Sequence, residues 1–282
     1  MKLVTFEAGG KVSWGVAVGE GIVDLGAKLG TRYPDVKSVL AADAQGEIAA
    51  AVKGDKADWQ LASVTLLPPI GNPDKVICVG VNYDEHRVET GRQKSDHPVI
   101  FTRFADTQIG HGQPLVRPRS SERFDYEGEL AVVIGRPGRH IPESTALAHI
   151  AGYACYNDGS VRDWQRHTHQ FTPGKNFPGT GGFGPWLVTA DEVPDPFKLT
   201  LTTRLNGEVV QKATTDMMIF NIPQLIAYIS GFTPLRAGDV IVTGTPGGVG
   251  DRRSPPLYMK PGDTVEVEIS GVGLLRNSIT AE

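Results

Sequence analysis

The sequence contains few cysteines and no long apolar run. Of its 282 residues, only Cys78 and Cys155 are cysteines, and no Cys-x-x-Cys pair exists, so a thiolate metal site is not indicated. No stretch approaches the roughly 18 consecutive apolar residues of a membrane helix. The start of the chain, Met1–Glu7, soon meets Gly9 and Gly10 and has the pattern of a strand rather than of a signal peptide. We therefore expect a cytoplasmic protein with reduced thiols and no membrane partner.

The sequence also lacks an excess of basic residues. Lys and Arg number 28 against 32 for Asp and Glu, and the formal net charge is −4, so a nucleic-acid surface is not expected. Hydrophobic residues make up 40% and charged residues 21%, which is a balance that supports a folded core. The 34 glycines and 20 prolines are spread along the whole chain, and this spacing favours many short segments separated by turns.

Two unequal parts are predicted, a small α/β domain over residues 1–66 and a larger domain over residues 74–282. In the first part, alternating apolar residues predict a meander of strands over Met1–Phe6, Ser13–Val18 and Gly21–Asp24, and Val36–Val52 has helical spacing. The Pro- and Gly-rich segment Leu66–Pro73 separates the two parts.

The second part is rich in strands. Its longer apolar runs predict seven of them, and Ile222–Ser230 has the one-sided apolar pattern of a helix. The expected strands are Lys75–Gly80, Pro98–Phe104, Glu127–Ile134, Ile150–Asn157, Leu199–Leu205, Asp239–Thr243 and Thr264–Ile269. The fold class that follows is α+β with a predominance of strands.

Three carboxylates at the ends of buried strands are the main candidates for a functional site. Glu127 and Glu129 lie two residues apart at the start of one strand, so a strand period of two places them on one face. Asp158 follows the apolar strand that ends at Asn157. A divalent cation such as Mg²⁺ or Mn²⁺ would offset the repulsion between these groups. The alternative is that the glutamates flank an exposed strand entry and that Asp158 caps a helix.

A histidine and a lysine in other segments are further candidates for the site. His86 and Glu89 are spaced i and i+3 on a predicted helix between Asp84 and Gly91, where a carboxylate would orient an imidazole that acts as a base; an exposed histidine on a polar helix is the alternative. Lys175 lies in a Gly- and Pro-rich loop, and there it either balances substrate charge or is simply solvated.

The segment Thr243–Gly250 is Gly-rich and follows a strand. It lacks the Gly-Lys-Ser/Thr ending of a phosphate-binding loop. Its backbone N–H groups, including those of Gly244 and Thr245, could bind a carboxylate; a plain turn is the alternative. Arg162, four residues after Asp158, could hold a substrate carboxylate or carbonyl together with Gln165, or could form a surface pair with Asp158 or Asp163.

Read together in order, these segments resemble the fumarylacetoacetate hydrolase family. The resemblance covers most of the chain from Lys75 to Ile279 and is specific for the family rather than for a substrate. The segments that carry it are Gly80-Val81-Asn82-Tyr83-x-x-His86, Pro98-Val99-Ile100-Phe101, Asp125-Tyr126-Glu127-x-Glu129-Leu130, Asn157-Asp158-x-x-x-Arg162-Asp163-x-Gln165, Gly174-Lys175-Asn176-Phe177, Leu205-Asn206-Gly207-Glu208-Val209-Val210-Gln211, Thr215 with Met218-Ile219-Phe220, the run from Leu235 to Gly250, and Lys260-Pro261-Gly262-Asp263.

The resemblance implies a mixed β-sandwich roll as the catalytic domain, one Mg²⁺ or Mn²⁺ ion per subunit, and a homodimer. It implies that Glu127, Glu129 and Asp158 bind the metal and that His86, Glu89 and Lys175 are catalytic. The expected substrate contacts are Arg103, Arg162, Gln165, Gly244 and Thr245.

Two features depart from the usual pattern of the family. Arg103-Phe104 stands where Lys-Pro is common, and Arg166–Gln170 adds His167 and His169, which would either shape the pocket or lie in a solvated loop. These departures leave the family resemblance intact and make the identity of the substrate uncertain from the sequence.

The expected activity is hydrolysis of a C–C bond in a small 2,4-dioxo acid, an acylpyruvate or a fumarylpyruvate-like compound, in the catabolism of aromatic compounds. The alternatives are an oxaloacetate-type decarboxylase, a lyase or isomerase on the same metal site, or a non-catalytic metal-stabilised binding protein.

Overall fold

The computed structural model describes all 282 residues. At its centre lie the adjacent antiparallel strands β11 (Gly128–Ile134) and β12 (Ile150–Asp158), in which every residue is buried. Alternate side chains of β11 enter different cores: Leu130, Val132 and Ile134 belong to one, and Ala131 and Val133 to another. A strand covered on both faces needs apolar residues throughout, which is the pattern that predicted it.

The strands form two main sheets. The twelve-stranded sheet has the order β4-β3-β2-β1-β14-β12-β11-β17-β6-β7, with β5 on β1 and β8 on β14; the five-stranded sheet has the order β16-β15-β18-β19-β9; and β10 pairs with β13. Their bounds are β1 (Lys2–Ala8), β2 (Lys11–Val18), β3 (Gly21–Asp24), β4 (Trp59–Gln60), β5 (Thr65–Leu67), β6 (Val76–Gly80), β7 (Val99–Arg103), β8 (Gln108–Ile109), β9 (Leu115–Arg117), β10 (Phe124–Asp125), β13 (Ser160–Val161), β14 (Gly181–Thr189), β15 (Thr200–Leu205), β16 (Glu208–Thr214), β17 (Val240–Val242), β18 (Thr264–Ile269) and β19 (Gly273–Ala281).

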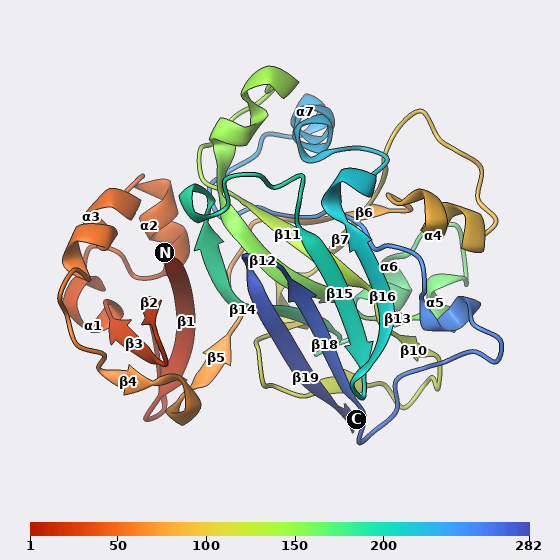
Figure 1. Cartoon of the computed structure of the whole chain (residues 1–282), viewed down its shortest axis with the longest axis horizontal. Helices are drawn as coiled ribbons and strands as arrows, with labels where there is room; N and C mark the ends of the chain where they lie inside the picture. The colour runs from red at the N-terminus through yellow and green to blue at the C-terminus, as the bar shows by residue number, and fades with distance from the viewer.

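The two main sheets pack face to face around the larger core. Tyr153 and Cys155 of β12 contribute to it from one sheet, and Leu201 of β15, Val267 of β18 and Leu275 of β19 from the other. Figure 1 shows β15, β18 and β19 lying across β11 and β12. This arrangement is the strand-rich α+β fold that the sequence predicts, and it places the start of β11 and the end of β12 at one rim.

The helices are few and short. They are α1 (Gly26–Leu29), α2 (Val36–Ala41), α3 (Gln45–Ala51), α4 (Asp84–Glu89), α5 (Arg162–Gln165), α6 (Thr172–Lys175) and α7 (Ile222–Phe232). The single helix predicted over Val36–Val52 is wrong: it is divided between α2 and α3, because Asp43 adopts a φ of +52° that helical geometry does not allow. No helix in the structure has the length and apolar character that a membrane span requires.

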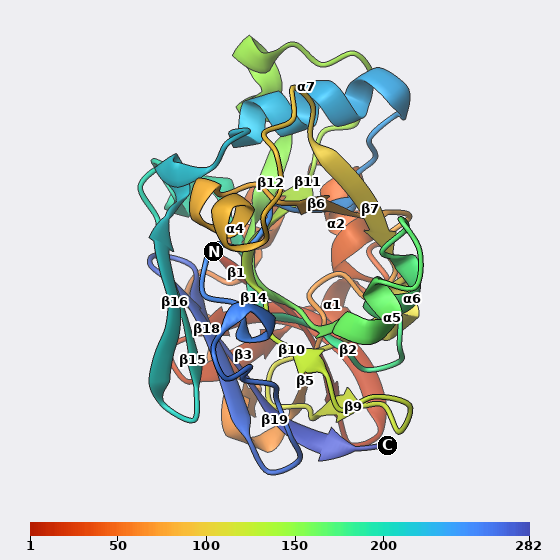
Figure 2. The same ribbon diagram turned by 90° about the vertical axis from the view of Figure 1, so that its right-hand side faces the viewer.

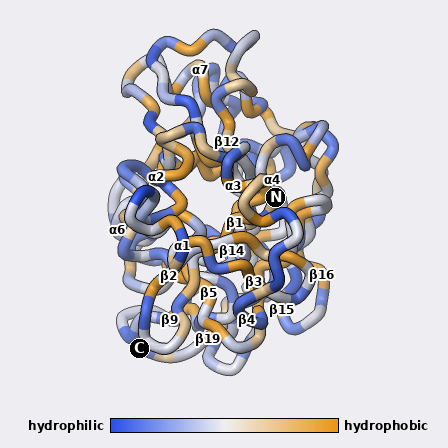
Figure 3. The backbone as a smooth tube through the Cα atoms, turned by 90° about the vertical axis from the view of Figure 1, so that its left-hand side faces the viewer, coloured by the Kyte–Doolittle hydropathy of each residue, from blue (hydrophilic) through white to orange (hydrophobic).

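The N-terminal strands continue the large sheet rather than forming a sheet of their own. Lys2 and Leu3 of β1 pair with Val188 and Leu187 of β14. Figure 1 shows this N-terminal part in red and orange on one flank, with α1 and α3 on its outer side and α2 beside β1, and Figure 3 shows hydrophobic colour on β1 and β14 where they meet. The second core accordingly combines side chains from both parts, among them Trp14, Val36 and Val240.

Candidate metal centre and active site

A cavity lies at the rim where β6 and β12 end and β11 begins. Figure 2 shows α4 on one side of this region and α5 with α6 on the other. The polar side chains that line the cavity come from segments far apart in the sequence. They are His86, Thr90, Arg92, Glu127, Glu129, Arg162, Gln165, Arg166, Lys175, Thr245 and Arg252, and the apolar lining includes Val79, Phe101 and Phe171.

The three carboxylates predicted as metal ligands converge in this cavity. One oxygen from each of Glu127, Glu129 and Asp158 lies within 4.8 Å of the others, and all three residues are buried. Pairing of β11 with β12 places Gly128 opposite Asn157, which brings the residues flanking that pair together. The exposed strand entry and the helix cap considered for these residues do not occur.

Three basic side chains neutralise two of these carboxylates. Lys175 Nζ lies 2.5 Å from Glu127 Oε2 and 2.6 Å from Asp158 Oδ2. Arg162 Nη1 lies 2.7 Å from Glu127 Oε1, and Arg103 Nη1 lies 2.6 Å from Asp158 Oδ1. Burial alone would raise the pKa of Glu127, but the charges of Lys175 and Arg162 outweigh it and hold that pKa below the usual range.

Glu129 has no such partner. The backbone N–H of Gly244 donates to Glu129 Oε2 at 2.5 Å, and no Lys, Arg or His forms an ion pair with this residue. Burial, together with the nearby charges of Asp158 and Glu127, raises the pKa of Glu129 well above its ordinary value. Counting buried side chains, the four carboxylates of Asp125, Glu127, Glu129 and Asp158 face the three cations of Arg103, Arg162 and Lys175.

This donor set fits a divalent metal ion. Hard carboxylate oxygens are the ligands that Mg²⁺ and Mn²⁺ prefer, and an uncompensated buried carboxylate is costly unless a cation accompanies it. The ammonium of Lys175 already bridges two of the three carboxylates, so the site is built to hold positive charge. Glu127, Glu129 and Asp158 are the residues that would bind the ion.

His86 and Glu89 form the predicted pair on α4. His86 Nδ1 lies 2.7 Å from Glu89 Oε1, and Glu89 Oε2 accepts the backbone N–H of Gly248 at 2.9 Å. Because a carboxylate accepts, Nδ1 carries the hydrogen in this contact, and the tautomer with that hydrogen has its lone pair on Nε2. His86 is buried and lines the cavity, so the exposed position considered for it is excluded.

The Gly-rich segment after β17 binds carboxylates of the protein itself. Its backbone N–H groups at Gly244, Gly248 and Gly250 donate to Glu129, Glu89 and Asp125. The predicted substrate contact through Gly244 is therefore corrected, since its N–H is already used. Thr245 does line the cavity, while its hydroxyl donates to the carbonyl of Gly128 and accepts from Gln211.

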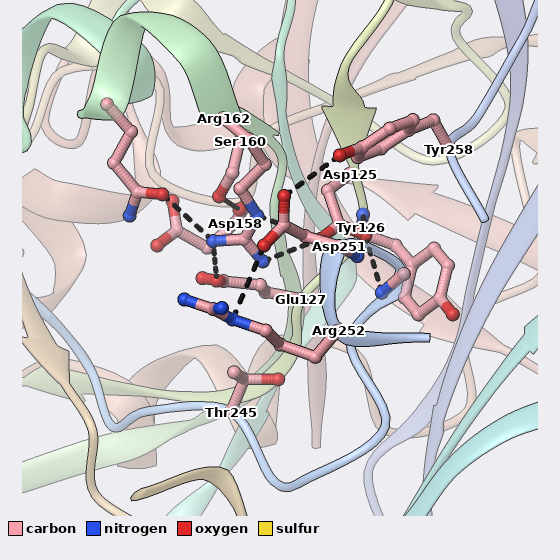
Figure 4. Close-up of polar contacts among 12 residues, drawn as sticks. Asp125, Tyr126, Glu127, Asp158, Ser160, Arg162, Thr245, Asp251, Arg252 and Tyr258 are labelled. Atoms are coloured by element: carbon pink, nitrogen blue, oxygen red, sulfur yellow. Dashed lines mark hydrogen bonds and ion pairs between the residues drawn. The ribbon is translucent and has the colours of Figure 1, made fainter. Parts of the chain in front are cut away.

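Arg162 and Gln165 lie side by side on α5. Arg162 Nε donates to Asp125 Oδ2 at 2.8 Å, and its Nη1 donates to Gln165 Oε1 at 3.0 Å. Figure 4 shows Arg162 between Asp125 and Glu127. The pairs with Asp158 or Asp163 considered from the sequence do not form. Because Gln165 Oε1 accepts from Arg162, the amide N–H₂ of Gln165 remains to donate to a ligand in the cavity.

Arg103 is placed differently from the prediction. Its guanidinium is buried behind Asp158 and donates to Asp158, to the carbonyl of Gly159 and to the hydroxyl of Thr180. It does not line the cavity, so the predicted substrate contact is not seen, and Arg103 instead holds the carboxylate of Asp158. His167 and His169 are exposed, and the ring of His167 contacts that of Trp164 at a tilt of 44°, with ring centroids 4.9 Å apart.

Three residues that the sequence interpretation left without a role belong to this site. Asp125 accepts hydrogen bonds from the N–H groups of Gly250 and Asp251 as well as from Arg162. Arg92 and Arg252 line the mouth of the cavity. The position of Asp125, two residues before a proposed ligand, was a signal for it, whereas no motif surrounds Arg92 or Arg252.

Comparison with known proteins places this geometry in a family. Residues 75–280 match the family model described as "Fumarylacetoacetate (FAA) hydrolase C-terminal". The human protein named "Oxaloacetate tautomerase FAHD2A, mitochondrial" is 40% identical, and the alignment covers 99% of this chain and 91% of that protein.

Two solved structures are similar over the whole chain. A fumarylacetoacetate hydrolase from Exiguobacterium antarcticum has a TM-score of 0.84 and 35% identity, with 100% of both chains covered. Maleylpyruvate hydrolase from Sphingobium sp. SYK-6, in complex with manganese(II) ion and pyruvate, has a TM-score of 0.82 and 30% identity, with 100% of this chain and 99% of that chain covered. These relatives are enzymes of small oxo acids, and the chain belongs to the fumarylacetoacetate hydrolase family.

Proposed function

We propose that this protein is a divalent-metal-dependent enzyme that enolises a small 2-oxo acid, and that its reaction is the keto–enol tautomerisation of oxaloacetate. The observation that carries the proposal is the buried carboxylate of Glu129, which lacks a basic partner and shares a cavity with the His86 base. The human tautomerase, 40% identical along nearly the full chain, supports oxaloacetate as the substrate.

The cavity residues divide the chemistry between them. A divalent ion held by Glu127, Glu129 and Asp158 would polarise the 2-oxo group of the substrate when bound. Tautomerisation moves a proton from C3 to the C2 oxygen and neither adds nor removes an atom. His86 removes the C3 proton through Nε2, Glu89 stabilises the imidazolium, and the imidazolium then returns the proton to the C2 oxygen. Lys175 and Arg162 balance the negative charge that develops on the oxo acid.

Hydrolysis of a C–C bond in a 2,4-dioxo acid is the second candidate. The neighbour that holds manganese and pyruvate is a maleylpyruvate hydrolase, which favours it. His86 would then take a proton from water, the hydroxide would attack the C4 carbonyl, and the C3–C4 bond would break to release pyruvate as its enolate. In a decarboxylase, by contrast, the enolate forms by loss of CO₂ and needs no attacking water.

Product analysis tests these reactions against one another. With Mg²⁺ or Mn²⁺, we expect the protein to speed the decay of enol-oxaloacetate absorbance with no matching release of pyruvate or CO₂. The same assay with acylpyruvates should show at most slow cleavage. Unchanged enol decay after addition of protein and metal would exclude the tautomerase, and CO₂ released at the rate of enol decay would identify a decarboxylase.

An assay of the metal-free protein tests whether the reaction requires the ion. Chelation followed by dialysis should abolish the acceleration, and Mg²⁺ or Mn²⁺ should restore it. Glu129→Gln should remain inactive in the presence of either ion. Full activity in the chelated protein would contradict the proposed role of the three carboxylates.

The assembly and the location of the protein also remain predictions. We propose a homodimer, because Val88, Val209 and Met217 are exposed apolar side chains, two of which line a surface groove beside α4. Light scattering in line with size-exclusion chromatography would test it. The human relative is described as mitochondrial, so fractionation of cells is needed to test the cytoplasmic location expected from the sequence.

A further inference from the structure

The mouth of the cavity carries more positive charge than the protein itself neutralises. Arg92, Arg166 and Arg252 all line it, and only one carboxylate, Asp251, forms ion pairs among them. Arg166 makes two contacts to Asp251 through its terminal nitrogens. Arg252 reaches the same carboxylate at a distance of 3.4 Å through Nε, so its terminal guanidinium nitrogens remain without an anionic partner.

Arg92 has no carboxylate partner at all. Its guanidinium stacks on the ring of Phe171, 5.1 Å from the centroid, while its backbone carbonyl accepts from Arg87 Nη1 at 3.0 Å. Burial and the nearby charges of Arg252 and Arg166 lower the pKa of Arg92. A guanidinium that is held against an aromatic ring beside like charges is arranged to receive an anion.

Arg252 is fixed by the same network that holds Arg162. It ends the short 3-10 turn Gly250–Arg252, whose N–H groups at Gly250 and Asp251 donate to Asp125 at 2.9 and 3.0 Å. Only glycine fits at position 250, because a Cβ there would lie 1.8 Å from the carbonyl oxygen of Leu257. Figure 4 shows the Arg252 side chain extending below Glu127 and above Thr245.

We propose that Arg92 and Arg252 form a second anion subsite, which binds the distal carboxylate of a dicarboxylic 2-oxo acid. The proposal rests on the proposed function, in which the metal site, Lys175 and Arg162 receive the 2-oxo-acid end of the substrate deeper in the cavity. The distal carboxylate then lies toward the mouth of the cavity. Arg92, which follows the C-terminus of α4, contacts it from one side, and Arg252 contacts it from the turn Gly250–Arg252. These two residues select diacids over monoacids of the same length.

Binding of matched ligand pairs to the Mn²⁺-loaded protein tests this subsite. In one pair, malate and 2-hydroxybutanoate differ only by a carboxylate in place of a methyl group; in the other, 2-oxoglutarate and 2-oxopentanoate differ in the same way. Calorimetry should show that the wild type prefers the diacid by about 10- to 100-fold in at least one pair, as expected for charge-assisted hydrogen bonds.

The variant Arg92→Met with Arg252→Met should reduce this preference to near one, because the diacid should lose far more affinity than the monoacid. Arg139→Met, an exposed arginine outside the cavity, controls for the change in net charge. Thermal unfolding of each variant checks that it is folded. No preference in either pair for the wild type, an unchanged preference in the double variant, or an equal loss in Arg139→Met would overturn the subsite.

The outcome is distinguishable from failure of the proposed reaction. If the protein prefers the diacid but does not accelerate enol decay, the anion subsite is supported and the tautomerase activity is excluded. If the protein accelerates enol decay but shows no preference for the diacid, the tautomerase activity is supported and the anion subsite is excluded.

Discussion

The carboxylate of Glu89 holds the imidazole of His86 at 2.7 Å. The two residues lie one helical turn apart on α4, and the second oxygen of Glu89 is fixed by the N–H of Gly248. The imidazole is therefore oriented from a helix and a loop that are 159 residues apart. A base fixed in this way keeps its lone pair on Nε2, toward the cavity.

Replacement of His86 by Ala should reduce kcat for enolisation by about 10²- to 10⁴-fold, which is the usual contribution of a general base. Glu89→Gln should reduce kcat in the same direction with little change in KM, because it alters the hydrogen-bonded tautomer of His86. Enol decay measured at saturating substrate checks both. Glu85→Gln, an exposed neighbour on the same helix, is the matched control and should be neutral. A loss confined to KM would argue that the pair binds substrate rather than moving a proton.

Replacing Glu129 or Glu127 by the uncharged Gln should change the stability of the metal-free protein in opposite directions. Glu129→Gln removes a buried carboxylate that lacks a basic partner and keeps an acceptor for Gly244, so the free energy of unfolding should rise by about 1–3 kcal/mol. Glu127→Gln breaks contacts with Lys175 and Arg162 and should lower it by about 3–5 kcal/mol. Urea unfolding in EDTA measures both, and calorimetry with Mn²⁺ should show loss of binding in each. If both Glu129→Gln and Glu127→Gln destabilised the protein, the carboxylate of Glu129 would not be a buried charge without a compensating cation.

Arg103 should act through Asp158. Arg103→Met removes a buried guanidinium that donates to Asp158, Gly159 and Thr180, so Mn²⁺ affinity should fall about 10- to 100-fold, as is typical for residues that orient metal ligands. Arg103→Lys should recover part of this affinity because it keeps the charge but not the planar fork. The KM for oxo acid at saturating metal should change little, and a large rise there would restore the substrate contact that the sequence predicted.

The sequence predicted what depends on local pattern. The fully apolar runs of β11 and β12 were identified as strands, and the Glu127, Glu129 and His86 assignments followed from their spacing and from the family resemblance. Strand β14 was missed because Gly181-Gly182-Phe183-Gly184-Pro185 has the composition of a turn, and its pairing with β12 is what makes it a strand. The partners of Arg103 and Gly244 are 55 and 115 residues away, beyond the reach of any local pattern.

Close packing of α5 against α6 positions Lys175. A Cβ on Gly174 would lie 2.3 Å from the backbone N of Gln165 and 2.5 Å from its Cα, so Gly174→Ala must displace one of the two helices. We expect a loss of about 1–3 kcal/mol in stability and a marked fall in kcat, measured by urea unfolding and enol decay. Gly231→Ala, in α7 with nothing within 4 Å of the added atom, should instead stabilise the protein by about 0.5–1 kcal/mol. Equal effects of the two substitutions would exclude the steric explanation.

The N-terminal part should be required for the catalytic part to fold, although the boundaries 1–66 and 74–282 remain predictions. Strand β1 continues the main sheet by pairing with β14, and Trp14 and Val36 share a core with Tyr156, Phe183 and Val240. Removal of residues 1–66 would therefore expose both an unpaired strand edge and apolar side chains next to β12 and β14.

The truncated chain should lack a cooperative unfolding transition and should aggregate, as calorimetry and light scattering would show. Arg32→Ala, which breaks an exposed pair with Glu47 and a contact with the ring of Tyr33 in the N-terminal part, should leave the transition nearly unchanged because surface ion pairs contribute about 0–1 kcal/mol. A soluble 67–282 fragment that unfolds cooperatively and binds Mn²⁺ would show that the shared core is dispensable, and the N-terminal part would then act as a separate domain.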